Sequence, residues 1–214
     1  MNLSYYTSLF GQISEGLKYT VGLFFITAIF SIPLGLLLSF VRVSRFKKIQ
    51  TLLGGYIWLM RGTPLILQLY FFYFGLSLIT PINLDRFPAA IIAFILNYAA
   101  YFCEIFRGGL LGVNRGQYEA AKVLGFSSFQ TNVRIVIPQM LRITLPSVAN
   151  EFITLVKDTS LITVLGIQEI LFISKTAVNR DVNISAYAVV AVFYLAATFL
   201  LTHFFNYLEK KFEY

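Results

Sequence analysis

The sequence predicts an all-α protein that crosses a membrane about five times. Of the 214 residues, 57% are hydrophobic and only 13% are charged, a balance typical of polytopic membrane proteins rather than of soluble domains. The mean hydropathy is +0.74. Because each membrane helix needs about 20 apolar residues, we expect residues 1–214 to form a single transmembrane domain.

The apolar segments can be followed in order along the chain. The first contains Pro33, which a membrane helix tolerates when neighbouring helices satisfy the freed carbonyl. The second is interrupted by Arg61-Gly62-Thr63-Pro64, where Arg61 either bonds carbonyls freed by Pro64 or has a direct role. The expected membrane segments are residues 19–41, 53–79, 88–106, a long region from 135 to 173, and 184–207.

Basic residues between these segments predict the orientation. Four of them, Arg42, Arg45, Lys47 and Lys48, follow the first segment. Lys and Arg accumulate on the cytoplasmic side of membrane helices. We therefore expect the N-terminus outside, the C-terminus inside and a cytoplasmic loop at about residues 107–134. The net charge of +7 is explained by this topology without a nucleic-acid partner.

The fourth region is polar on one helical face. Ser147, Glu151, Thr154 and Asp158 follow one another at steps of four, three and four residues, which places them on one side of a helix. Ionisable residues at membrane depth are costly, so they face protein or water and are commonly functional. We expect Glu151 and Asp158 to line a water-filled path. The alternative is a structural ion pair of Lys157 with either carboxylate.

A helix break is expected at residues 157–161. Asp158, Thr159 and Ser160 are all residues that cap helix N-termini. A half-helix that begins there would aim free N–H groups at a substrate carboxylate. Asn97 and Gln68 could add hydrogen bonds to the substrate, or could only hold helices together.

The loop at residues 107–134 is rich in glycine and polar residues. Residues 117–124 are good helix formers, Gly125 can end that helix in a left-handed conformation, and Ser127 with Gln130 forms a capping box for the next helix. We therefore expect two short helices joined at Gly125. The pattern Glu119-Ala120-Ala121 followed by Gly125 is weak when taken alone.

Several motifs in a fixed order resemble those of the membrane subunit of an ATP-binding-cassette importer, of the polar amino-acid permease family. They cover about half of the chain. In order, they are Arg61-Gly62-Thr63-Pro64, Glu104-Ile105-Phe106-Arg107-Gly108-Gly109, Gly116-Gln117-Tyr118-Glu119-Ala120-Ala121 with Gly125, Ile137-Pro138-Gln139, Leu145-Pro146, Asn150-Glu151-Phe152-Ile153 and Lys157-Asp158-Thr159-Ser160-Leu161. Ile137 departs from the leucine that is more usual in the family.

The resemblance implies partners and a division of labour. Glu119, Ala120, Ala121 and Gly125 would form the surface that couples the chain to a pair of ATPase subunits. The chain has no phosphate-binding loop of the Gly-x-x-x-x-Gly-Lys-Ser/Thr type, so ATP with Mg²⁺ is expected on the partner. A second permease subunit, identical or similar, and an extracellular solute-binding protein are implied as well. No enzymatic activity, no cofactor and no metal site are expected in the chain.

The predicted function is ATP-driven import of a polar amino acid across a bacterial or archaeal cell membrane. The substrate-binding residues would be Asn97, Glu151, Asp158, Thr159, Ser160, Gln68 and Lys157. Two acidic groups favour a cationic substrate, arginine, lysine or histidine. A neutral or polar substrate such as glutamine or cystine remains an alternative, and so does an ion-coupled secondary transporter that uses Glu151 and Asp158 as a relay.

Overall fold

The structure, a computed structural model, describes residues 3–212 and contains helices but no strands within them. The all-α fold is therefore confirmed. The helices are α1 Leu3–Arg42, α2 Lys47–Gly62, α3 Leu65–Tyr70, η1 Phe71–Gly75, α4 Leu76–Ile79, α5 Arg86–Gly112, α6 Arg115–Val123, α7 Ser128–Thr131, η2 Asn132–Val136, α8 Ile137–Asp158, η3 Thr159–Leu165, α9 Ile170–Asp181 and α10 Ser185–Phe212. Of these, η1 and η2 are π-helical turns and η3 is a 3₁₀-helix.

Three helices are long and apolar enough to cross a membrane, namely α1, α5 and α10. Two bent pairs bring the number to as many as five. The first joins α2 to the α3–α4 segment at an angle of 107°, and the second joins the segment ending at Leu165 to α9 at 55°. Each of the five expected membrane segments thus corresponds to one helix or one bent pair.

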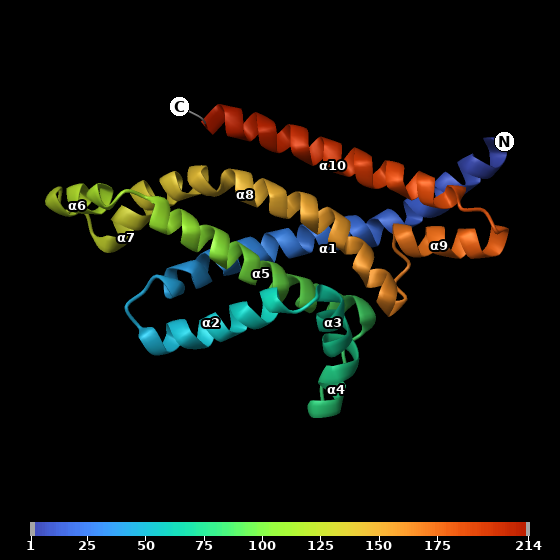
Figure 1. The fold of residues 1–214 in the computed structure, drawn as a ribbon, viewed down its shortest axis with the longest axis horizontal. Helices are drawn as coiled ribbons and strands as arrows, with labels where there is room; N and C mark the ends of the chain where they lie inside the picture. The colour runs from blue at the N-terminus through green and yellow to red at the C-terminus, as the bar shows by residue number, and fades with distance from the viewer. Residues whose placement is uncertain (1–2, 213–214) are drawn as a thin grey trace.

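The long axis of the bundle has two distinct ends (Figure 1). The short helices α6 and α7 lie at one end, and α9 lies at the other, near the described start of α1. Helices α3 and α4 point away from the long axis. The 40 residues of α1 span about 60 Å, which is longer than the predicted segment 19–41. Its added first part packs on α9 and α10 through Leu9 and Ile13.

The main core lies where α1, α5 and α8 meet. Phe94, Phe102 and Leu155 are fully buried in it. α1 approaches α5 closely at Gly35, where an added Cβ would lie 2.6 Å from the Phe102 Cβ. Because α5 is covered on several sides by α1, α2 and α8, it provides a fixed wall for the polar groups described below.

Candidate functional site

A pocket of about 490 Å³ lies where the break after α2 faces α5, α8 and η3. It contains two carboxylates and one guanidinium, together with amide and phenol groups from α5. The lining residues are Arg61, Gly62, Thr63, Pro64, Leu65, Asn97, Tyr98, Tyr101, Glu151, Thr154, Asp158 and Leu161. We call this cavity the central pocket.

The polar face of α8 reaches the central pocket. Glu151, Thr154 and Asp158 all line it, which confirms that these residues share one face. Ser147, the first member of the predicted stripe, is exposed and lies outside the lining. The Tyr98 hydroxyl donates a hydrogen bond of 2.8 Å to Asp158 Oδ2. This bond fixes one carboxylate against the wall formed by α5.

No ion pair of Lys157 with Glu151 or Asp158 is found among residues 3–212. Lys157 is exposed and does not line the central pocket. The competing interpretation, in which the polar face is only a structural ion pair, is therefore not supported by the geometry. Both carboxylates remain available to the pocket.

The break at Pro64 is held by two amide side chains. Gln68 Nε2 donates to the carbonyl oxygens of Met60 at 2.9 Å and Thr63 at 3.2 Å. Asn97 Nδ2 donates to the Met60 carbonyl and to Gln68 Oε1, both at 3.0 Å. Gln68 thus satisfies carbonyls that the helix break leaves without partners, and it does not line the central pocket. Asn97 takes part in this brace and also lines the pocket.

Arg61 supplies the positive charge of the central pocket. Its guanidinium lies over the Tyr101 ring, 5.2 Å from the ring centre, and both residues line the cavity. A guanidinium stacked on an aromatic ring keeps its N–H groups free at the edge of the plane. The pocket therefore presents one cation and two carboxylates.

The helix break expected at residues 157–161 is wrong. The backbone of Thr159 stays helical, with φ −54° and ψ −25°, and α8 continues directly into η3. The hydroxyls of Thr159 and Ser160 bond back to the carbonyls of Val156 and Lys157, both at 2.7 Å. Ser and Thr commonly bond back in this way within helices. Hence no free helix N-terminus points into the pocket, and neither hydroxyl lines it.

The chain turns instead at Gly166, which has φ 72°. Glu169 then begins α9, and its buried carboxylate accepts hydrogen bonds from the backbone N–H groups of Leu171 and Phe172 at 2.8 and 2.6 Å. A carboxylate at a helix N-terminus satisfies otherwise free N–H groups. The bend between η3 and α9 is therefore fixed by Gly166 and Glu169.

The loop after α5 folds as the sequence predicts. α6 ends in a left-handed Gly125 with φ 79°, and the N–H groups of Gly125 and Phe126 bond to the carbonyls of Lys122 and Ala121. This bond pair is a Schellman motif. Ser127 and Gln130 form the expected capping box at the start of α7. The two short helices and the glycine between them are confirmed.

The exposed face of this loop differs from the expected one. Glu119 and Ala120 are exposed, but Ala121 is only 1% exposed and faces the protein interior. Ala121 is therefore not part of the free surface. Three large apolar side chains that the sequence pattern does not single out are exposed here, namely Val123, Leu124 and Phe129.

Tyr98 and Tyr101 are site residues that were not predicted from the sequence. Tyr98 and Tyr101 lie one and four residues after Asn97, so all three lie on one side of α5. This spacing was the available signal, but tyrosine is also common at membrane interfaces. The spacing became informative only when the structure placed Asp158 in contact with Tyr98.

Comparisons with known proteins identify the family. Residues 31–214 match the family described as "Binding-protein-dependent transport system inner membrane component". The L-cystine transport system permease protein TcyB of Bacillus subtilis is 33% identical over 203 residues, covering 94% of this chain and 86% of that protein. The arginine transport system permease protein ArtQ of Bacillus subtilis is 34% identical over 200 residues, covering 93% and 91%.

A solved structure, "Crystal structure of an amino acid ABC transporter with histidines", matches with a TM-score of 0.85 and 30% identity over 98% of this chain and 96% of that one. The relatives and the solved structure agree with this chain over nearly its whole length. These relatives are transport subunits rather than enzymes. The chain belongs to the permease subunits of ATP-binding-cassette importers, in the family of amino-acid permeases.

Proposed function

We propose that this chain carries a cationic amino acid across the cell membrane and binds it in the central pocket. The observation that carries the proposal is the presence of Arg61, Glu151 and Asp158 around one cavity of about 490 Å³. An amino acid with a basic side chain has one carboxylate and two cationic groups. The pocket has the complementary set, one cation and two carboxylates.

Each group has a role in this proposal. Arg61 binds the substrate carboxylate, since a guanidinium matches a carboxylate with paired hydrogen bonds. Glu151 and Asp158 bind the α-ammonium and the basic side chain. Tyr98 holds Asp158 in place through the 2.8 Å hydrogen bond. In this proposal Arg61 binds the substrate carboxylate, a role that the sequence had suggested for the helix start at Thr159 and Ser160. The hydroxyls of those two residues bond to the backbone of the helix instead.

A neutral polar amino acid is the second candidate. TcyB is named for L-cystine and ArtQ for arginine, so similarity alone does not select the substrate. The second acidic group of the pocket favours the cationic class, because an unpaired carboxylate at membrane depth is costly. Binding of a basic side chain removes that cost.

We infer that α6 and α7 lie in the cytoplasm and dock on an ATPase subunit. Val123, Leu124 and Phe129 are exposed at this end of the bundle, and exposed apolar clusters mark sites of protein contact. The N-terminus is then outside, where a solute-binding protein delivers the substrate. A second permease subunit, identical or similar, completes the translocation path, and its ATPase partners hold ATP and Mg²⁺.

The test is uptake of L-arginine into proteoliposomes that contain the complete transporter, with ATP supplied to the ATPase. We expect Glu151→Gln to abolish or strongly impair uptake, because the substituted amide no longer neutralises a cationic group. Assembly with the ATPase should remain intact. Ser147→Ala, on the same helix but outside the pocket, is the matched control.

Three outcomes would contradict the proposal. Arginine uptake that is unchanged in Glu151→Gln would remove Glu151 from the binding site. Glutamine uptake that exceeds arginine uptake in the unmodified protein would select the neutral class. Transport that persists without ATP would instead favour an ion-coupled transporter.

A further inference from the structure

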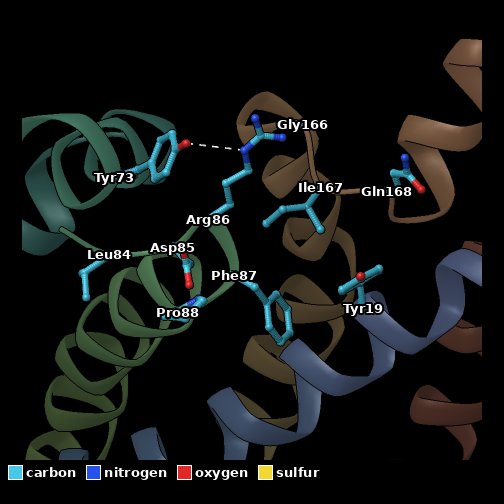
Figure 2. Close-up of a pocket in the computed structure, with 10 residues that line it drawn as sticks. All are labelled: Tyr19, Tyr73, Leu84, Asp85, Arg86, Phe87, Pro88, Gly166, Ile167 and Gln168. Atoms are coloured by element: carbon cyan, nitrogen blue, oxygen red, sulfur yellow. Dashed lines mark hydrogen bonds between the residues drawn. The ribbon is translucent and has the colours of Figure 1, made fainter.

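A second and larger pocket lies at the end of α5 that is remote from α6. Its volume is about 730 Å³, within the range of about 300–1,000 Å³ that is usual for small-molecule sites. Figure 2 shows its lining, which comes from the start of α5, from η1, from α1 and from the turn between η3 and α9. We call this cavity the outer pocket.

The outer pocket contains two opposite charges that are adjacent in sequence but do not pair. Within the described residues, no ion pair joins Asp85 to Arg86, and the Asp85 side chain does not cap α5. In Figure 2 the Arg86 guanidinium points toward Gly166, whereas the Asp85 carboxylate lies nearer Pro88. The two charges therefore line the same cavity without neutralising each other.

One hydrogen bond orients the exposed Arg86 side chain. Its Nε donates to the Tyr73 hydroxyl at 3.4 Å, and among residues 3–212 the two terminal nitrogens form no hydrogen bond or ion pair. An added Cβ on Gly166 would lie 3.0 Å from Arg86 Nη1. Gly166 also has φ 72°, a conformation that other residues adopt with strain. Glycine at this turn therefore leaves room for the guanidinium at the pocket wall.

An apolar layer separates the outer pocket from the central pocket. Helix α3 packs against η3, and Leu69 and Ile162 are fully buried members of the same core cluster. Leu65 and Leu161, on the inner side of this layer, line the central pocket. Gly166, at the far end of η3, lines the outer one. The two cavities thus lie on opposite sides of the contact between α3 and η3.

We propose that the outer pocket is a separate binding site for a free amino acid, in which Arg86 binds the α-carboxylate and Asp85 the α-ammonium. The site takes the substrate before the contact between α3 and η3 opens to the central pocket. This assignment rests on the proposed function as an amino-acid importer. Recognition depends on the α-carboxylate and the α-ammonium of the ligand, so the site accepts amino acids regardless of their side chain.

The test uses a cysteine introduced at the rim of the outer pocket. The natural Cys103 is the only cysteine of the chain and is buried, whereas Gln168 is exposed and lines the pocket. The rate of maleimide labelling of Gln168→Cys is measured in the assembled transporter in nanodiscs. We expect L-arginine to slow this labelling. Agmatine, which is arginine without its carboxylate, should not.

The substitution Arg86→Gln identifies the contact. We expect it to raise the arginine concentration needed for protection by about tenfold or more, the factor associated with loss of a charge-assisted hydrogen bond. Lys175→Cys is the control, because Lys175 is exposed on α9 and lies outside the pocket lining. Its labelling should be insensitive to arginine.

The same measurement in the Glu151→Gln background separates the two sites. Protection that persists there supports an independent outer site, even if the central pocket proves to bind no amino acid. Protection that disappears with Glu151→Gln would overturn the proposal, since it would report only occupancy of the central pocket. Equal protection by agmatine, or no protection by arginine, would overturn it as well.

Discussion

The exposed apolar side chains of α6 and α7 allow a quantitative test of ATPase docking. Phe129 is 76% exposed and Leu124 is 72% exposed. Complete burial of such a side chain contributes about 1.5–3 kcal/mol. If the ATPase covers the exposed part of one of them, the contact contributes about 1–2 kcal/mol, and truncation to alanine should weaken docking by about 5- to 30-fold.

The assay is the dissociation constant between detergent-solubilised permease and its purified ATPase subunit. Phe129→Ala and Leu124→Ala are the test variants, and alanine preserves the helical backbone. Ile184→Ala is the matched control, because Ile184 is 77% exposed but precedes α10, far along the bundle from α6 (Figure 1). Arginine binding to the central pocket should be unchanged in all three variants.

An unchanged dissociation constant for the combined Phe129→Ala and Leu124→Ala variant would refute the assignment of this face as the docking surface. Equal weakening by Ile184→Ala would refute it too, because it would show a general effect of apolar truncation. Weaker docking that is confined to the loop variants is the expected result.

Three further variants test how the fold supports the site. Gly35→Leu should prevent stable assembly, measured by size-exclusion chromatography, because its side chain would overlap Phe102. Glu104→Ala should lower the free energy of unfolding by about 1–3 kcal/mol, since Arg107 loses a bidentate partner at 2.8–3.1 Å. Glu104→Gln should restore part of this loss. Deletion of Arg134 should separate ATP hydrolysis from arginine uptake.

Most of the fold could be predicted because membrane helices leave a strong signal in the sequence. Segment 88–106 lies within α5, and segment 184–207 lies within α10 except for its first residue. The first part of α1 was missed, because residues 3–18 pack on α9 through scattered apolar contacts rather than through a continuous apolar run. Helices that pack on protein need only one apolar stripe.

The candidate site was predicted in part, and the misses have a common physical origin. The face of α8 with Glu151 and Asp158 followed from helical spacing alone. The prediction of a helix break at Thr159 failed because residue type does not determine whether a hydroxyl caps a new helix or bonds back to the preceding turn. Arg61 and Tyr98 became site residues only through contacts between segments distant in sequence.

The expected effect of deleting Arg134 rests on the way in which α8 connects the two ends of the molecule. α7 continues through the π-helical turn η2 into α8 without a loop. The 22 residues of α8 extend about 33 Å from this turn to Asp158.

A π-turn contains one residue more than an α-helical turn, so removing a residue from η2 would restore an α-helix. It would also replace the π-turn, a place where helices bend, by straight α-helix between α7 and α8, with little rotation of the flanking segments. Arginine binding and ATPase docking should each survive, since neither surface is changed. Hydrolysis without uptake is therefore expected, measured in the same proteoliposomes. Coupled uptake at the normal ratio would show that the π-turn η2 is not needed to transmit the movement.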